Sequence, residues 1–184
     1  MTASCNQQQP LAEKEVPQQA LFPRLTTQRL ELAPLTEHER WLYQRLYTDP
    51  KIMRNTAPPF SKEKVDAMFE HTLKVIASPP PKALVWVIKQ QIDGLPIGII
   101  CFYEIEADLS NAKIGIMLLT EANGKLFPEE AMQVVMDFGI QQWGLKRITA
   151  EFMSRNLATA RFVKKLGFEF LPSDSDTQIC CYTP

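Results

Sequence analysis

The sequence of 184 residues predicts an α/β domain built on one mixed β-sheet of about seven strands flanked by about four helices. Strand-like and helix-like segments follow one another along the chain, and capping residues and prolines mark the expected helix ends. No internal repeat and no second linker divides the chain after its first residues. Residues 24–184 are therefore expected to form one domain, and residues 1–23, rich in Gln and Pro, a flexible tail.

The domain is expected to begin with a strand followed by a helix. Polar and apolar residues alternate over Arg29–Leu35, which predicts a strand that ends near Pro34. Thr36 and Glu39 have the spacing of a capping box, so a helix should start there. This helix is expected to end at Asp49-Pro50, because proline cannot continue it.

A second helix and a β-hairpin should come next. Ser61 is the expected N-cap of the helix, and the three prolines at 79–81 end it. The runs Ala83–Gln90 and Pro96–Glu104 are rich in β-forming residues, and Asp93-Gly94 between them is typical of a tight turn.

The second half of the chain repeats this alternation of strands and helices. Pro128 is placed to open a long helix, and Gly167 is placed to follow the end of a shorter one at Asn156–Leu166. Strands are expected at Ala112–Leu119, Arg147–Met153, Phe168–Leu171 and Thr177–Tyr182.

Composition excludes several classes of protein. With 20 basic and 21 acidic residues the net charge is −1, so neither nucleic acid nor an anionic membrane surface is an expected partner. No apolar run approaches the roughly 20 residues of a membrane span, and the N-terminus lacks the features of a signal peptide. We expect a cytoplasmic location. The four cysteines and two histidines show no metal-ligand spacing, so no metal is expected and the thiols should be free.

The stretch from Ile114 to the helix at Pro128 has the order strand, glycine-bearing loop, helix start. Unpaired amides and the helix dipole at such a junction favour a bound anion such as pyrophosphate, although many α/β turns look alike. Gly124-Lys125 is not a nucleotide P-loop, because Leu119 stands where the first glycine is required and Leu126 where Ser or Thr is required.

The ordered set of short motifs resembles the GNAT superfamily of N-acetyltransferases, and within it the Rim-type branch of ribosomal-protein alanine acetyltransferases. The resemblance covers residues 25–170, and each piece is loose whereas their order is specific. The matching pieces are Thr27–Leu30, Asp49–Arg54, Gly94–Gly98, Gly124-Lys125, Glu130-Ala131, Gly144–Ile148, Asn156–Arg161 and Gly167-Phe168.

This resemblance implies that acetyl-CoA is the co-substrate. Its pantetheine arm would lie between the strands Ile114–Leu119 and Arg147–Met153 and pair with backbone of the first. The carried-over contacts are strand backbone at Met117, Leu118 and Leu119, loop amides at Asn123, Gly124, Lys125, Leu126, Phe127 and Glu129, and the side chains of Asn156 and Thr159.

The chain also departs from the family pattern. Leu126-Phe127-Pro128 stands where a second small residue is usual, and Pro128 has no N–H to offer a phosphate. Val163 occupies the position of the tyrosine acid of many members. Rim-type members carry a serine near the thiol instead, at the position of Thr159, which equally fits a threonine that bonds locally at a helix start.

Transfer of an acetyl group to an amine needs a base and a donor for the developing oxyanion. Glu104 is the first candidate for the base, with Glu106 and Glu151 as second choices, although each also fits a solvated carboxylate at a strand end. A backbone amide near Leu118 or Leu119 is the expected oxyanion donor. His38 and His71 are expected to have surface roles.

We therefore expect an N-acetyltransferase that moves the acetyl group to a primary amine, on a peptide N-terminus or a small molecule, by direct attack in a ternary complex. Trp41, Tyr43, Tyr47 and the loop 54–60 fit either an acceptor pocket or plain packing. One alternative is a GNAT-like acyl-CoA-binding or scaffold module with little or no turnover. Another is an interaction protein that recruits partners through its tail or through the strand Thr177–Tyr182. Pairing of this strand between two copies of the chain would also form a homodimer.

Overall fold

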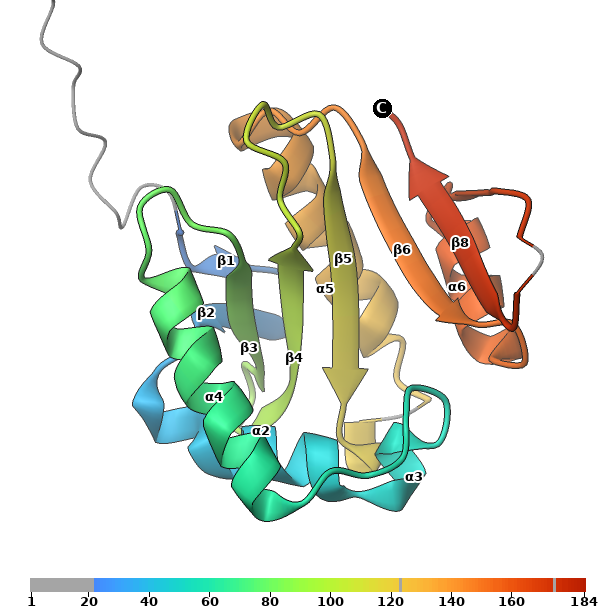
Figure 1. Cartoon of the computed structure of the whole chain (residues 1–184). Coiled ribbons are helices and arrows are strands. Elements are labelled where there is room, and N and C mark those ends of the chain that lie inside the picture. The colour runs from blue at the N-terminus through green and yellow to red at the C-terminus, as the bar shows by residue number, and fades with distance from the viewer. Residues whose placement is uncertain (1–21, 123, 174) are drawn as a thin grey trace, which may run out of the picture.

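The computed structural model describes residues 22–122, 124–173 and 175–184 (Figure 1). Expectations for residues 1–21 and for Asn123 therefore lie outside the described residues.

One mixed sheet runs through the described part of the chain, with eight strands in the order β1-β2-β3-β4-β5-β6-β8-β7. Every neighbouring pair is antiparallel except β5 and β6, which are parallel. The strands are β1 (Leu25–Thr26), β2 (Leu30–Pro34), β3 (Leu84–Gln90), β4 (Pro96–Tyr103), β5 (Ala112–Leu118), β6 (Ile148–Met153), β7 (Glu169–Phe170) and β8 (Thr177–Tyr182).

The helical elements lie between these strands, as the sequence predicts. They are the short 3₁₀ turns η1 (Glu37–Glu39) and η2 (Thr120–Ala122), the π-helical turn η3 (Phe138–Gln142), and the helices α2 (Arg40–Thr48), α3 (Pro50–Met53), α4 (Lys62–Ile76), α5 (Phe127–Asp137) and α6 (Leu157–Lys165).

Local capping chemistry accounts for the start of the first two long helices. The Thr36 hydroxyl accepts a bond from the His38 amide, and the Glu39 carboxylate accepts from the Thr36 amide at 3.1 Å, which completes the predicted capping box. The Ser61 hydroxyl accepts from the Lys64 amide at 3.3 Å and begins α4. Asp49 ends α2 and caps the short α3, which the sequence analysis does not predict. The two-residue strand β1 and the 3₁₀ turn η2 are also added elements.

Two apolar cores cover the two faces of the sheet, and Figure 1 shows α4 in front of the sheet and α5 behind it. The core under α5 is the larger and includes Trp86, Phe102, Met132 and Val135. The core under α2 and α4 includes Leu42, Leu46, Phe69 and Val87. Successive strand residues therefore serve opposite faces, as the strand period of two requires.

Strand β8 confirms the predicted bounds Thr177–Tyr182, but it does not lie at an edge of the sheet. It pairs with β6 along its whole length and with β7 at Cys180 and Cys181. At these two residues β8 is paired on both sides, so it has no free edge there for a strand of another chain.

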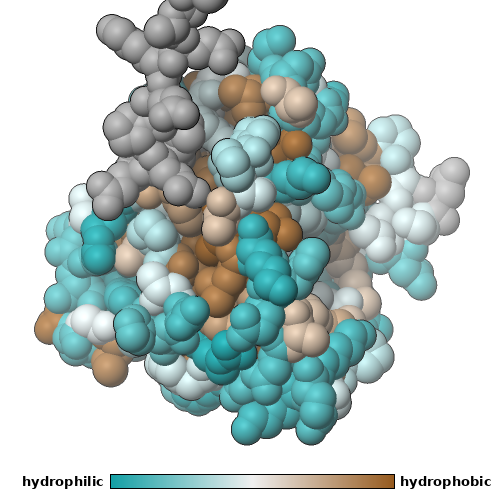
Figure 2. All heavy atoms as spheres, turned by 60° about the vertical axis from the view of Figure 1, so that its left-hand side comes forward, coloured by the Kyte–Doolittle hydropathy of each residue, from teal (hydrophilic) through white to brown (hydrophobic). Residues whose placement is uncertain are grey.

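The large apolar side chains that are exposed on the described part include Trp41, Ile92 and Leu95. Figure 2 shows hydrophobic residues gathered near the middle of one face and bordered by hydrophilic residues. None of the described helices is both long enough and apolar enough to span a bilayer.

Candidate functional site

Strands β5 and β6 are joined at only one end. Their parallel register pairs Ala112 with Ile148 and Lys113 with Thr149, and no further pair follows in the described strands. Figure 1 shows the two strands side by side at their N-terminal ends and apart at their C-terminal ends. The edge of β5 that faces β6 is therefore open along most of its length.

A cavity of about 650 Å³ lies at this divergence and reaches both faces of the sheet. On the α2 and α4 side its walls include Tyr43, Tyr47, Thr72, Val75, Cys101, Tyr103 and Met117, and on the other side Ile116, Met132, Phe152, Phe162 and Val163. One volume is therefore bounded by side chains of both layers at the place where β5 and β6 separate.

The register of β4 and β5 decides which main-chain groups face the cavity. The Leu119 amide donates to the Ile97 carbonyl at 2.8 Å, whereas the Ala112 amide donates toward β6, to the Arg147 carbonyl at 3.3 Å. In a strand the N–H and C=O of one residue point to one neighbouring strand, and those of the next residue point to the other side. The N–H and C=O of Met117 and Leu119 therefore face β4, and those of Leu118 face the gap between β5 and β6.

This orientation corrects one of the expected roles. Leu119 is buried and its N–H is already bonded to β4, so it is not available as an oxyanion donor. Of the three residues expected to pair with the pantetheine arm, only Leu118 directs its N–H and C=O into the gap between β5 and β6.

The loop before α5 contains the other expected cofactor residues. Gly124 has a φ of +75° and Leu126 a φ of +59°, so the chain makes a tight left-handed turn into the helix. Lys125 and Leu126 are exposed, Glu129 is half-buried in the first turn of α5, and Phe127 is buried in the core. Helix α5 thus begins at Phe127, one residue before the Pro128 that the sequence analysis takes as its start. The cavity walls do not include this loop.

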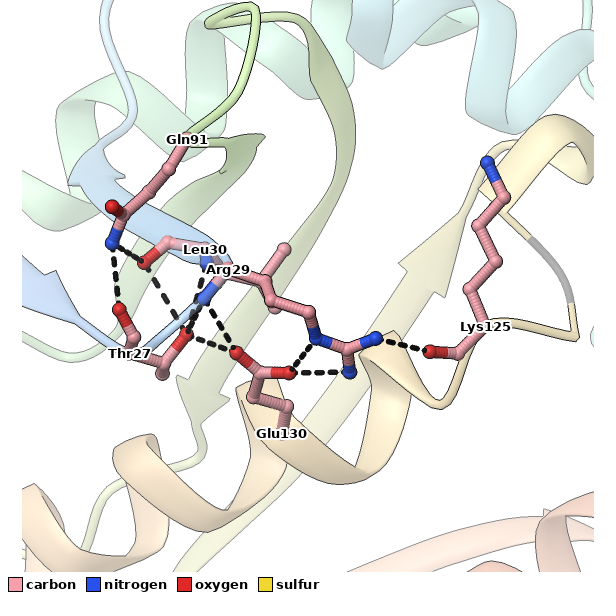
Figure 3. A network of polar contacts seen from close by, with 6 residues as sticks. All are labelled: Thr27, Arg29, Leu30, Gln91, Lys125 and Glu130. Carbon is pink, nitrogen blue, oxygen red and sulfur yellow. Dashed lines mark hydrogen bonds and ion pairs between the residues drawn. The ribbon is translucent and has the colours of Figure 1, made fainter.

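A polar network between the first strand region and α5 holds this loop (Figure 3). The Glu130 carboxylate accepts hydrogen bonds from the Arg29 amide at 3.0 Å, from Arg29 Nε at 2.6 Å and from the Thr27 hydroxyl. Arg29 also donates to the Lys125 carbonyl at 2.9 Å, and its guanidinium lies 4.8 Å from the centre of the Phe127 ring. The turn that carries Gly124 and Lys125 is therefore anchored at its C-terminal end.

Asn156 and Thr159 lie at the start of α6, and both line the cavity. The Asn156 side-chain oxygen accepts a hydrogen bond from the Thr159 amide at 3.3 Å, which makes Asn156 the N-cap of the helix. The same side chain can cap α6 with its oxygen and present its NH₂ group to the cavity. Its role as a helix cap is therefore compatible with a contact to a molecule in the cavity.

Three charged side chains meet at the rim of the cavity. Lys113 Nζ lies 2.7 Å from Glu104 Oε2 and 2.9 Å from Glu151 Oε1, and these hydrogen bonds raise the pKa of the Lys113 ammonium. Both carboxylates line the cavity. Glu104 has a φ of +47° and follows the last residue of β4. Glu106, the other candidate base, does not line the cavity and instead accepts a hydrogen bond from Ser110.

The remaining groups of the cavity wall are mostly apolar or uncharged. Burial raises the pKa of the Cys101 thiol and of the Tyr103 hydroxyl to about 12, and it also raises the pKa of Tyr47. These three groups therefore stay neutral near pH 7. His38 and His71 are exposed, as expected for surface roles, although His71 reaches the rim of the cavity.

The sequence analysis misses several residues of this site. Tyr103 on β4 and Gly115 on β5 look like ordinary strand residues in the sequence, and both line the cavity. Lys113 on β5 reaches the rim through its ion pairs with Glu104 and Glu151. Gly115 leaves room there, since an added Cβ would lie 3.4 Å from the Tyr103 ring and 3.6 Å from Cys101 Sγ. Among the residues that the structure describes, no group of three His, Cys, Asp or Glu side chains could hold a metal ion.

Comparison with known proteins places these features in a family. A family model described as an acetyltransferase (GNAT) domain matches residues 29–169. The uncharacterized N-acetyltransferase YoaA of Bacillus subtilis is 24% identical over 154 residues, which cover 81% of this chain and 84% of YoaA. The probable N-acetyltransferase YjcK of the same organism is 37% identical over 77 residues, covering 41% of this chain and 42% of YjcK.

A similar solved structure is that of RimL, a ribosomal L7/L12 α-N-protein acetyltransferase in complex with coenzyme A. Its TM-score is 0.76 at 16% identity, over 88% of this chain and 98% of that one. This likeness shows that the fold is shared, in agreement with the parallel β5–β6 pair and the open gap beside it. The match of the family model to most of the described residues decides the assignment: the chain belongs to the GNAT family of acetyltransferases.

Proposed function

We propose that this chain transfers the acetyl group of acetyl-CoA to a primary amine by direct attack in a ternary complex. The observation that supports it most is the cavity between β5 and β6, which is lined by residues from both faces of the sheet. A donor could enter from the α5 and α6 side and an acceptor from the α2 and α4 side.

The residues present fit an extended thioester arm in the gap. The Leu118 N–H and C=O face the open edge of β5, where they could pair with amide groups of the arm as a neighbouring strand would. The N–H of Leu118 is also the donor that we propose for the oxyanion. Such a donor stabilises negative charge as it develops on the carbonyl oxygen.

The turn at Gly124–Phe127 and the first residues of α5 are the proposed pyrophosphate site. Among the described residues, the amides of Gly124, Lys125 and Leu126 donate no hydrogen bond within the chain, so they are available to an anion. Lys125 adds a positive side chain, and the N-terminus of α5 adds its dipole. Asn123 belongs to the same proposal but lies outside the described residues.

Glu104 remains the proposed base, with Glu151 as the second choice, because both carboxylates line the cavity. The acceptor must lose a proton to become a nucleophile. An α-amine with a pKa of about 8 makes a smaller demand on the base than a lysine side chain near 10.4. Asn156 and Thr159 are proposed to contact the pantetheine arm from the start of α6. The acceptor is a small-molecule amine or a peptide N-terminus.

Titration of the protein with acetyl-CoA, followed by thermal unfolding, tests the first step. A ligand at 100 times its Kd stabilises a protein by about 2.7 kcal/mol, which for this size is a rise in Tm of about 5–10 °C. Coenzyme A should give a similar rise and ATP a much smaller one. A panel of primary amines, with release of free coenzyme A thiol as the readout, then tests transfer.

A second reading, a module that binds acyl-CoA without turnover, is supported by Leu126-Phe127-Pro128 in the phosphate loop. Thermal stabilisation by acetyl-CoA with no thiol release from any amine would favour it. Absence of stabilisation at millimolar acetyl-CoA would contradict both readings.

A further inference from the structure

The two carboxylates at the rim of the cavity are already occupied by a cation of the same chain. Lys113 Nζ lies within 3 Å of both Glu104 and Glu151, at 2.7 and 2.9 Å, so one ammonium bridges the end of β4 and the middle of β6. The Lys113 side chain is only 23% exposed, whereas those of Glu104 and Glu151 are 63% and 32% exposed. The ammonium is therefore held on the inner side of the pair.

The rest of the cavity offers no free negative charge. Its walls on the acceptor side combine aromatic and apolar residues with the uncharged polar side chains of Asn55, Thr56 and Thr72, and His71 lies at the rim. The charged side chains along these walls are Lys82, Glu104 and Glu151. Together with the bridging Lys113 they make two positive and two negative charges. These charges cancel, so the cavity has no net negative charge, and Lys82 forms no ion pair with any described residue.

We infer that Lys113 sets the charge preference of the acceptor, and that this chain acetylates amines with a single positive charge on an apolar or aromatic body in preference to diamines and polyamines. This inference rests on the proposed function. A second ammonium on the acceptor would have to lose part of its hydration in the cavity, and such a cost is recovered only by a carboxylate that is free to pair with it. Lys113 occupies both of the carboxylates that could do so.

The structure also predicts how the preference can be reversed. Removing the Lys113 ammonium would leave Glu104 and Glu151 unpaired beside the cavity, in position to accept a cation from the solvent side. The acceptor's second ammonium would then replace the one that Lys113 supplies. Lys113 acts here as a specificity-determining residue. Because it also pairs with the proposed base Glu104, its removal would change the rate with every amine, and the test therefore uses a ratio in which such a common change cancels.

The test compares butylamine with putrescine, which have the same four-carbon chain and differ by one ammonium. The readout is the ratio of kcat/KM for putrescine to kcat/KM for butylamine. Because both values come from one protein sample, a general change in activity cancels. Wild type should favour butylamine, and Lys113→Gln should raise the ratio by about three- to fivefold, the upper part of the range of a partly exposed ion pair.

Lys82→Gln is the matched control. It removes one positive charge from the same cavity but frees no carboxylate, so it should change the ratio by less than about twofold. Lys113→Arg keeps the bridging cation and should leave the ratio close to wild type. Adding Glu151→Gln to Lys113→Gln should remove most of the gain, since the two changes act on one pair.

Three results would overturn the inference: a wild-type preference for putrescine, an unchanged ratio in Lys113→Gln, or an equal rise in Lys82→Gln. The failure of the proposed function looks different, since no amine would then release thiol from acetyl-CoA in any variant. Thermal unfolding of each variant, with and without acetyl-CoA, shows whether it is folded and binds the donor.

Discussion

Glu130 accepts hydrogen bonds from both the backbone and the side chain of Arg29, a residue 101 positions earlier in the chain. The same guanidinium donates to the Lys125 carbonyl, so the turn before α5 is tied to the loop that precedes β2. This contact joins the first strands of the sheet to the proposed phosphate site.

Arg29→Gln should weaken the binding of acetyl-CoA more than it slows transfer. The variant loses the ion pair with Glu130 and the bond to Lys125, so the amides of the turn are less well ordered before binding. We expect KM for acetyl-CoA to rise by about three- to tenfold, with kcat at saturation within about twofold of wild type. Steady-state kinetics measure both.

Arg24→Gln provides the comparison for Arg29→Gln. It also removes a surface ion pair, with Glu31, but one that involves neither Lys125 nor Glu130. Its KM should match that of wild type, and an equal rise in both variants would refute the positioning role of Arg29.

The pH dependence of stability should reveal the same network. Burial of the Glu130 carboxyl opposes its charge, but hydrogen bonds from Thr27 and Arg29 outweigh burial and lower its pKa below the ordinary 4.5. The charged form is favoured in the folded state. Its contribution to the free energy of unfolding is therefore complete above the ordinary pKa and is lost as the pH falls through the folded-state pKa.

Urea unfolding of wild type and Glu130→Gln at several pH values measures this contribution. The difference in free energy of unfolding between them should be constant from about pH 7 to pH 5 and should shrink below about pH 4. A difference that stays the same down to pH 3 would show that the Glu130 charge adds nothing.

Gly124→Ala should damage donor binding as well as stability. Gly124 has a φ of +75° and no atom within 4 Å of an added Cβ, so alanine costs only backbone strain, about 1–2 kcal/mol. The turn would shift to relieve that strain, and the amides would leave their positions. We expect Tm to fall by several degrees and the Kd for coenzyme A, measured by calorimetry, to rise at least fivefold.

Gly94→Ala isolates the backbone effect. Gly94 lies in the turn between β3 and β4 with a φ of +69° and is equally open, so the loss of Tm should be similar. Its Kd for coenzyme A should not change. If Gly124→Ala binds coenzyme A as tightly as Gly94→Ala, the turn at Gly124 is not the phosphate site.

Substitutions at Asn156 can separate its cap from its proposed contact with the pantetheine arm. Asn156→Ala removes the oxygen that accepts from the Thr159 amide, which typically costs about 0.5–2 kcal/mol. Asn156→Asp keeps a capping oxygen but loses the amide N–H groups. We expect Tm to fall in the first variant only and KM for acetyl-CoA to rise in both. Restoration of KM by Asn156→Asp would limit Asn156 to a capping role.

Features set by neighbouring residues could be predicted from the sequence. The capping box at Thr36 and Glu39 and the bounds of β8 depend on local chemistry and on residue alternation, so the structure confirms them. The short β1 has only two residues and gives no periodic signal. Helix α5 starts earlier than Pro128 because Leu126 adopts the left-handed conformation and turns the chain.

The candidate site depends on contacts that no local pattern contains. The pairing of β5 with β4 decides whether the N–H of Leu118 or that of Leu119 faces the gap. A register that differed by one residue would exchange the two, and no local sequence pattern fixes the register. The bridge from Lys113 on β5 to Glu151 on β6 and to Glu104, the residue after β4, could not be predicted from their spacing in the sequence. The resemblance to the GNAT family predicts a gap between β5 and β6 and a binding loop before α5, but it does not predict which charged side chains surround them.

The parallel pairs Ala112–Ile148 and Lys113–Thr149 are the whole ladder between β1–β5 and the group β6, β8 and β7 in the described residues. The sheet is thus two half-sheets that share a short seam. Without a ligand, amide hydrogens of β6 and β8 should exchange in a block of their own, at a rate distinct from those of β3 and β4. A chain-like ligand in the gap would act as the missing strand, and it would make the two blocks exchange as one.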